Sequence, residues 1–218
     1  TGLRMLSNRY SAAANGQGMD AHIFVTHYHW DHIQGLPFFS PLYSAQNRFH
    51  FYSFRSDFLG RDSLKRVFEA QMALPYFPVD LGAMSAAREF TELAGGEHLT
   101  IGDTSIRTCW LNHPQGCLGF RFDTPDGSIV YATDNEPGRR EFDATLLEFC
   151  SGADVLINDA QFTPEQLTGS RKGWGHSSWE ASVRLAQEAG VRQLVLFHHD
   201  PDSTDKNLDE ILRRSQSQ

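Results

Sequence analysis

The sequence lacks the features of an exported, membrane-spanning or disulfide-stabilised protein. It contains only three cysteines, Cys109, Cys117 and Cys150, and none belongs to a C-x-x-C pair. An odd number without a spaced framework argues against disulfides and favours small, buried thiols. No apolar run approaches the ~20 residues that a membrane-spanning helix needs. No positively charged, apolar opening segment suggests export. We therefore expect a cytoplasmic protein that makes no contact with a membrane.

A surplus of positive charge is also lacking. Lysine and arginine together number 19, whereas aspartate and glutamate number 27, which gives a formal net charge of −8. Proteins that bind nucleic acid through its phosphates usually carry a basic surplus. The charge balance therefore disfavours nucleic acid as a partner, while it permits a small anion that is held mainly by metal.

The rest of the composition is typical of a globular protein. Hydrophobic residues make up 40% and charged residues 21% of a chain of 218 residues. That length is sufficient for one domain with a substantial core. Because the chain shows no repeat, low-complexity tract or linker, we predict a single domain over residues 1–218.

The hydrophobic pattern predicts both strands and helices. Strands are expected at 21–26, 49–54, 89–93, 98–101, 105–112, 118–123, 128–133, 155–158 and 193–197, and helices at 4–14, 62–73, 143–149 and 208–214. A further helix runs to residue 189 from a capping box formed by Ser177 and Glu180. Strands of antiparallel style come first, and strands that alternate with helices follow. This order favours a layered α/β sandwich.

The strongest chemical signal is a group of metal-ligand residues directly after the first expected strand. His27, His29, Asp31 and His32 lie within six residues. Alternation along an extended segment would place His27 and His29 on one side, and a turn would bring Asp31 and His32 to a second point. Imidazole and carboxylate ligands together suit zinc and similar metals.

Other candidate ligands follow expected strands in the same way. His113, Asp134 and the pair His198 and His199 each come at the end of a strand. Loops at strand ends often carry the functional groups of a rigid scaffold. Each of these residues alone would suit a turn or a core position, so it is their recurrence at strand ends that makes them candidates.

These motifs, in this order, resemble the five-motif metal signature of the metallo-β-lactamase superfamily. The resemblance covers nearly the whole chain and implies a four-layered αββα sandwich with two divalent metal ions at one edge. Zinc is favoured, with manganese or iron as alternatives. Carried over residue by residue, the signature assigns one metal to His27, His29 and His113 and the second to Asp31, His32 and His198, with Asp134 as the bridge. His198 is preferred to His199 because the family's ligand follows the strand almost immediately.

A narrower resemblance is to the phosphodiesterase branch, which includes ribonuclease Z and cyclic-phosphate phosphodiesterases. The run from Gly175 to Ser178, Gly-His-Ser-Ser, is similar to that branch's Gly-His-Ser-Thr element. The run from Asp159 to Phe162 stands where ribonuclease Z has a Glu-Ala-Thr-Phe-like run. The resemblance implies that His176 is a general acid oriented by Asp159, and Asp31 joins them in the expected catalytic set.

The chain departs from the family pattern at two points. The extended basic arm that ribonuclease Z uses for transfer RNA is not visible, in agreement with the negative charge balance. The opening Thr1-Gly2-Leu3-Arg4 resembles the inside of the family's Asp-Ala-Gly-Thr-Gly-like turn, so the family's N-terminal strands are expected to be missing. Either the sequence is a fragment, or another chain supplies that sheet edge in a homo-oligomer.

Three functions are compatible with this reading. The first is a phosphodiesterase that acts on a small, cyclic phosphodiester, with a metal-bridging hydroxide as the nucleophile and His176 protonating the leaving oxygen. The second is a hydrolase of carboxylic esters, lactones, thioesters or β-lactams on the same metals. The third is a non-catalytic metal-binding module, against which the complete ligand set argues. The segment from Leu59 to Ala94 is the best candidate for a substrate cover.

Overall fold

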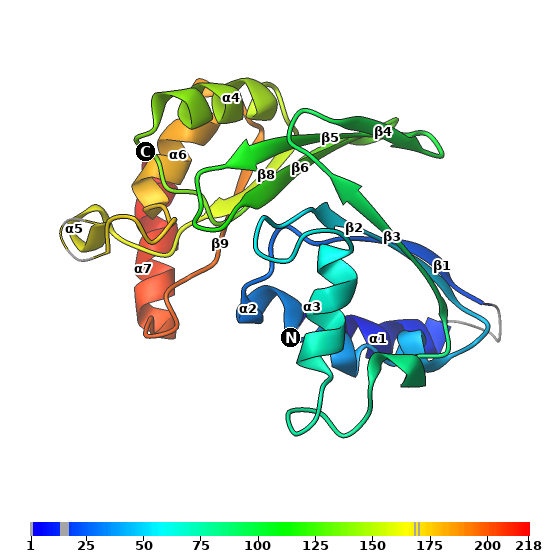
Figure 1. Cartoon of the computed structure of the whole chain (residues 1–218). Helices are drawn as coiled ribbons and strands as arrows, with labels where there is room; N and C mark the ends of the chain where they lie inside the picture. Colours follow the sequence, from blue (N-terminus) through cyan, green and yellow to red (C-terminus); the bar gives the residue numbers. More distant parts are fainter. Residues whose placement is uncertain (1, 14–17, 168, 170) are drawn as a thin grey trace. The chain divides into compact units, whose positions relative to one another are not determined.

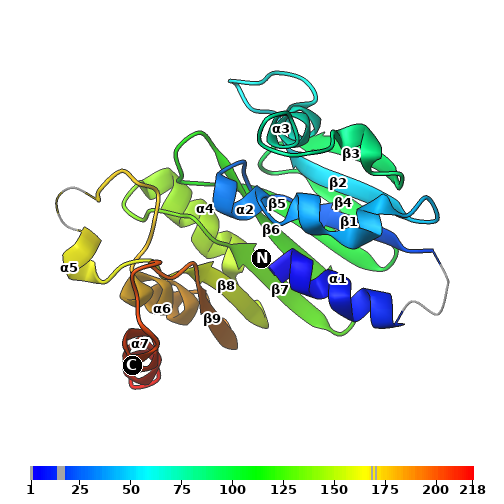
Figure 2. The same ribbon diagram turned by 90° about the horizontal axis from the view of Figure 1, so that it is seen from below.

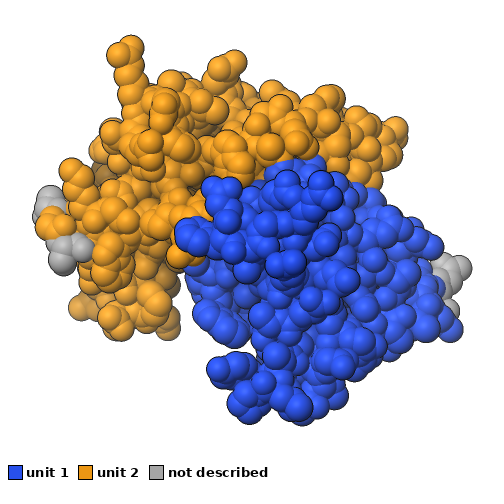
Figure 3. Space-filling view, viewed as in Figure 1, with its two compact units in different colours: residues 1–93 blue, residues 94–218 orange. Residues whose placement is uncertain are grey.

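The computed structural model describes residues 2–13, 18–167, 169 and 171–218. Figure 3 shows the two compact units into which the chain divides, residues 1–93 and 94–218. Each unit contains its own sheet, with three strands in the first unit and six in the second. A mixed α/β fold with two sheets is thus confirmed, whereas the grouping of all residues into one domain stays a prediction.

The first unit is built around a parallel sheet in the order β1-β2-β3 (Figures 1 and 2). In chain order its helices and strands are α1 (Gly2–Ala13), β1 (Asp20–Phe24), α2 (Trp30–Ile33), β2 (Arg48–Phe54), α3 (Ser63–Gln71) and β3 (Ala87–Leu93), with short 3-10 helices at Leu36–Phe38, Ser40–Tyr43 and Leu81–Ala83. The helix expected at 4–14 corresponds to α1, and residue 14 lies outside the described residues.

The parallel pairing of this sheet corrects the expectation that antiparallel strands come first. Parallel neighbours require a crossover of a dozen or more residues, which usually contains a helix. Residues 25–47, with α2, and residues 55–86, with α3, provide the two crossovers. Most of the segment Leu59–Ala94 belongs to the second crossover, where Leu74 is 80% and Tyr76 79% exposed. Its role as a substrate cover stays a prediction.

The core of the first unit holds the strands that precede the histidine-rich segment. Phe49 and Phe51, alternate residues of β2, are fully buried, and the ring of Phe51 lies 5.3 Å from that of Phe68 on α3. Burying such a side chain stabilises the fold by roughly 1.5–3 kcal/mol. Beyond β1, the backbone N–H of Val25 still donates to the carbonyl of Tyr52 at 2.8 Å. This hydrogen bond holds the backbone just before His27 against β2.

The second unit has a six-stranded sheet in the order β4-β5-β6-β7-β8-β9. Its elements are β4 (His98–Ile101), β5 (Thr104–Leu111), β6 (Cys117–Thr124), β7 (Gly127–Ala132), α4 (Arg140–Cys150), β8 (Val155–Asp159), α5 (Pro164–Leu167), α6 (Trp179–Glu188), β9 (Gln193–Phe197) and α7 (Asp205–Ser215). Strands β5 and β7 are both antiparallel to β6, and β7, β8 and β9 are mutually parallel. The carboxyl ends of β5, β7, β8 and β9 therefore lie at the same edge of the sheet.

The start of α6 corrects one sequence prediction. Its N-cap is Ser178, whose Oγ accepts from the backbone N–H of Ala181 at 3.2 Å, and not Ser177. Glu180 does not close a capping box; its Oε1 instead lies 3.5 Å from Arg214 Nη2 on α7. The helix itself is confirmed, and its N-cap lies one residue later than expected.

The three cysteines are buried thiols outside any disulfide, as the sequence predicted. Burial raises the pKa of the Cys150 thiol to about 12 and that of Cys109 still further. Since the thiolate is the reactive form, these side chains act as small core residues and not as nucleophiles. Within the described ranges, none of the helices is long and apolar enough to cross a membrane.

Candidate metal centre

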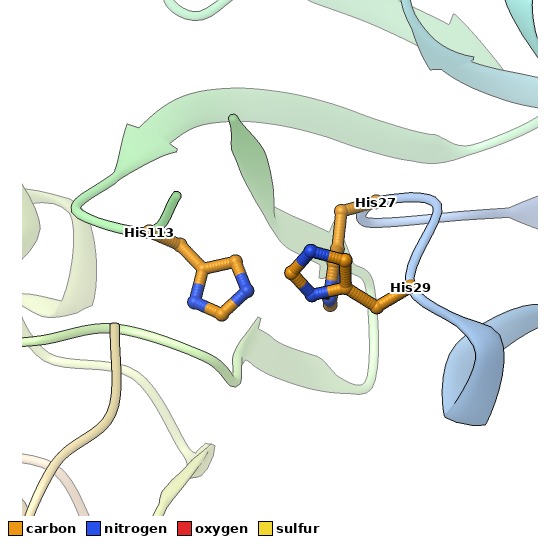
Figure 4. A group of neighbouring side chains, drawn as sticks. All are labelled: His27, His29 and His113. Atoms are coloured by element: carbon orange, nitrogen blue, oxygen red, sulfur yellow. Dashed lines mark hydrogen bonds between the residues drawn. The ribbon is translucent and has the colours of Figure 1, made fainter. Parts of the chain in front are cut away.

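The first unit gathers ligand-type side chains on the segment between β1 and α2. Nε2 of His27 lies 3.1 Å from Nδ1 of His29 (Figure 4). His27 is almost fully buried, and its Nδ1 lies 3.1 Å from Oγ1 of Thr26. Metal-binding histidines usually have their second ring nitrogen held by a hydrogen-bond partner, which fixes the ring. Thr26 takes this position for His27.

Helix α2 brings the other two residues of the first motif to the same place. The rings of His27 and His32 are 4.2 Å apart, and Nε2 of His32 lies 3.0 Å from Oδ2 of Asp31. The Asp31 side chain is 55% exposed, whereas that of His32 is 11% exposed. The pattern expected from the spacing, an extended pair followed by a turn, thus produces one compact group of nitrogen and oxygen donors.

The second unit gathers a further group at the carboxyl ends of its strands. His113 follows β5 (Figure 4), Asp134 follows β7, and His198 follows β9. Oδ2 of Asp134 lies 3.9 Å from Nε2 of His113 and 3.4 Å from Nε2 of His198. Because these strands end at one edge, candidate ligands that are far apart in the sequence lie around a single carboxylate, which is 2% exposed.

Two residues of this group have a strained backbone. Asp134 has a φ of 61° and His198 a φ of 56°, both in the left-handed region that residues other than glycine seldom adopt. Such conformations persist where the surrounding structure enforces them, and they are concentrated at functional sites. At these two sharp turns, Nε2 of His198 and Oδ2 of Asp134 lie 3.4 Å apart.

The structure separates His198 from its neighbour His199. Whereas His198 faces Asp134, His199 lines a cavity between α6, β9 and α7. This placement agrees with the choice of His198 as the candidate ligand, and its metal-binding role stays a prediction.

His176 and Asp159 form a hydrogen-bonded pair next to the Asp134 group. Nδ1 of His176 lies 2.8 Å from Oδ2 of Asp159 and 4.0 Å from Oδ2 of Asp134. The Asp159 side chain is fully buried, and its other oxygen accepts from the backbone N–H of Gln161 at 3.0 Å. The His176 ring stacks on that of His198 at 4.9 Å. A carboxylate that accepts from Nδ1 fixes the ring and its tautomer, so that Nε2 is the atom able to exchange a proton.

Sequence reasoning missed Glu136, which holds the loop that carries His176. Its carboxylate accepts from the backbone N–H of Gly173 at 2.9 Å and of Gly175 at 2.8 Å. The carbonyl of Gly175 in turn lies 2.9 Å from Nδ1 of His113. The closeness of Glu136 to Asp134 in the sequence was the available signal, but nothing in the sequence links it to a loop 37 to 39 residues away.

Gly175 is required at its position for two geometric reasons. Its φ is +88°, and a Cβ added there would lie 2.2 Å from Nδ1 of His113. Any side chain would displace the histidine ring or the loop. The Gly-His-Ser-Ser element therefore depends on its glycine to bring the backbone against His113.

We predict that Glu136→Ala slows turnover up to about 10²-fold, the effect of a misplacement of about 1 Å at a catalytic group. The reason is that the loop from Gly173 to His176 loses its two acceptors. Glu136→Gln keeps one acceptor oxygen and should recover most of the loss. Steady-state kinetics of both variants and elemental analysis check this. Equal losses in the two variants would assign the effect to the charge of Glu136 and not to its hydrogen bonds.

The donors in both units fit divalent metal ions. His27 and His113 each have one ring nitrogen next to a protein oxygen, Thr26 Oγ1 and the Gly175 carbonyl. This arrangement is typical of ligating histidines. Donor atoms of His113, Asp134 and His176 lie within 4.8 Å of one another. Imidazole combined with carboxylate suits zinc, manganese or iron, and the absence of thiolates disfavours softer ions.

Comparison with known proteins identifies the family of the chain. The family described as beta-lactamase superfamily domain matches residues 4–199. Ribonuclease BN of Escherichia coli is 24% identical over 89% of this chain and 75% of its own length. Ribonuclease Z of Brevibacillus brevis is 27% identical over 58% of this chain, and the match spans only 37% of that protein.

Solved structures share the fold. Human tRNase Z, short form, has a TM-score of 0.63 at 19% sequence identity, covering 83% of this chain and 73% of the human chain. This likeness confirms the predicted metallo-β-lactamase fold. From its family match over residues 4–199, its fold and its donor groups, the chain belongs to the beta-lactamase superfamily, a family of metal-dependent hydrolases.

Proposed function

We propose that the chain is a metal-dependent phosphodiesterase that acts on a small phosphodiester at a two-metal centre. The proposed ligands are those expected from the sequence: His27, His29 and His113 for one ion, Asp31, His32 and His198 for the other, and Asp134 for both. Support comes from the donor chemistry of each unit and from the family match.

Zinc is the proposed metal, because most of these ligands are imidazole nitrogens. When bound, a pair of divalent ions would supply Lewis acidity toward the phosphoryl oxygens and lower the pKa of water to about 7. The buried Asp134 carboxylate offsets part of the positive charge that such ions bring.

The hydrogen-bonded pair of His176 and Asp159 is the observation that carries the phosphodiesterase proposal. With Nδ1 held by Asp159 at 2.8 Å, His176 can deliver a proton only from Nε2. Cleavage of a phosphodiester expels an alkoxide, which is a poor leaving group unless it is protonated. The ring would deliver that proton, and the buried carboxylate of Asp159 stabilises the charged imidazolium before the transfer.

The charge of the chain supports a small substrate. A formal net charge of −8 gives little attraction for a polyanion such as transfer RNA. Ribonuclease Z of Brevibacillus brevis, at 27% identity, and ribonuclease BN of Escherichia coli, at 24%, support phosphodiester chemistry. A cyclic or otherwise compact phosphodiester is both small and a substrate for phosphodiester chemistry.

We predict that hydrolysis of a small phosphodiester depends only weakly on salt. A substrate that pairs with few lysines or arginines releases few counterions on binding, so the slope of log(kcat/KM) against log salt should have a magnitude below about 2. The measurement is kcat/KM for four substrates: a cyclic nucleotide, bis(p-nitrophenyl) phosphate, p-nitrophenyl acetate and a transfer RNA precursor. It is made between about 50 and about 200 mM salt, a range over which nucleic-acid binding weakens strongly.

Two results would contradict the proposal. Efficient, strongly salt-dependent cleavage of the transfer RNA precursor would make RNA the substrate. Hydrolysis of the acetate ester without hydrolysis of either phosphodiester would favour the carboxylic-ester alternative.

A further inference from the structure

The sheet of the first unit carries a second group of histidines and carboxylates. His22 on β1 is in register with His50 on β2, which is in register with Glu89 on β3. In a parallel sheet, residues in register point to the same face. Asp20, two residues before His22 on β1, points to that face as well. Three strands thus align His22, His50 and Glu89 in one row across the sheet, and Asp20 lies two residues from that row on β1.

The potential ligand atoms of this group are close together. Nε2 of His50 lies 3.1 Å from Oδ1 of Asp20. The rings of His22 and His50 are stacked, with centroids 4.6 Å apart and planes 15° apart. One donor atom from each of Asp20, His22 and His50 lies within 4.8 Å of the others. Small rotations of these partly exposed side chains would bring all three atoms to one ion.

The remaining ring nitrogens have the partners that metal-binding histidines need. Nδ1 of His50 lies 3.1 Å from Oε2 of Glu89, and Nδ1 of His22 lies 2.9 Å from the hydroxyl of Tyr52. A ligating imidazole usually donates its second N–H to a carboxylate or another oxygen, which sets the tautomer and strengthens the ligand. Both rings are therefore arranged so that Nε2 is the atom available for coordination.

We propose that Asp20, His22 and His50 bind a divalent transition-metal ion, best represented by Zn²⁺, at a site distinct from the candidate metal centre. Three protein ligands leave a coordination position for water, as zinc sites with an open position have. The ion would join β1 to β2, while Glu89 and Tyr52 orient the rings. The site lies within the first unit, and the inference does not depend on the proposed phosphodiesterase activity.

The protonation of His22 agrees with this assignment. Burial lowers the pKa of His22, and the neighbouring His50 lowers it further, while Asp20 acts in the opposite direction. A neutral imidazole is the form that binds metal. The competing explanation is that His50 only contacts Asp20 and Glu89 and that no metal binds.

The test compares the zinc content of the whole chain with that of His22→Gln/His50→Gln. Both proteins are dialysed against buffered Zn²⁺ and analysed for bound metal. We expect the double variant to hold about one ion fewer per chain, because losing two of three ligands removes the site. His98→Gln is the matched control: His98 is also an exposed strand histidine, bonded to Ser105, and it belongs to the second unit. Equal zinc content in the wild type and the double variant would overturn the proposal.

A milder variant and a direct readout keep the test decisive should the double variant fail to fold. Glu89→Gln keeps all three ligands, and it should weaken zinc binding at this site about 10–100-fold without changing the number of ions at saturation. In the wild type, ¹⁵N NMR during a Zn²⁺ titration should show large shifts of Nε2 in both His22 and His50. Unchanged Nε2 signals at saturating zinc would overturn the proposal.

Discussion

Asp134→Ala is expected to abolish binding of both ions of the candidate metal centre. The carboxylate is buried and lies 3.4 Å from His198 Nε2 and 3.9 Å from His113 Nε2. Its removal takes away the negative charge and the oxygen donor that both ions would share, and leaves only neutral nitrogen donors around that point. Ions of this kind supply several kcal/mol of transition-state stabilisation. Since each 1.36 kcal/mol is about tenfold in rate, turnover should fall by roughly 10³-fold or more.

Elemental analysis with steady-state kinetics measures this effect. His199→Ala is the matched control, because His199 is adjacent to His198 but lines the cavity between α6, β9 and α7. His198→Ala should lose one ion and His199→Ala none. If Asp134→Ala retains one ion, Asp134 is not the bridge. If His199→Ala loses an ion, His199 and not His198 is the ligand.

His176→Ala is expected to keep its metals and its fold but to lose roughly 10²–10⁴-fold in turnover, the range for removal of a general acid. The pair with Asp159 places the exchangeable proton on Nε2. The loss should therefore be larger for a substrate with an alkoxide leaving group, such as a cyclic nucleotide, than for bis(p-nitrophenyl) phosphate. Nitrophenolate departs without a proton, so it removes the need for an acid.

The dependence on the leaving group distinguishes the roles that His176 could have. Equal losses on the two substrates would mean that His176 binds or positions the phosphate. Loss of an ion would make it a ligand, which its 4.0 Å distance from Asp134 Oδ2 also permits. Asp159→Asn is the companion variant, because it keeps the size of the side chain while it removes the charge that holds Nδ1. It should reproduce much of the His176→Ala loss with the same dependence on leaving group.

The grouping of the first four candidate ligands could be predicted from the sequence because its geometry is local. Residues 27 to 32 are contiguous, and an extended segment followed by a short helix brings their side chains together whatever surrounds them. The strand-end candidates could also be predicted, since hydrophobic patterns mark where β5, β7 and β9 stop. The sequence likewise indicated that the cysteines are buried, because isolated cysteines without a framework are usually core residues.

Other features depend on which strands are neighbours. The sequence suggested antiparallel strands first, whereas β1, β2 and β3 are parallel. A strand's hydrophobic pattern reports which faces are buried, and it says little about the direction of the neighbouring strand. The cap of α6 fell on Ser178 and not Ser177 for a similar reason, because two adjacent serines offer equal local chemistry and the packing of the loop selects one.

The sequence by itself predicted the family, most of the strands and helices, and the candidate metal-ligand residues, since each of these follows from residue types at short spacing. Only the tertiary structure decided that His198 and not His199 faces Asp134, that Glu136 holds the Gly175 loop, and that His22, His50 and Glu89 share one row of the sheet. These relations join residues far apart in the chain. They are fixed by strand register and by loops bonded across the fold, where one residue of shift turns a side chain to the opposite face.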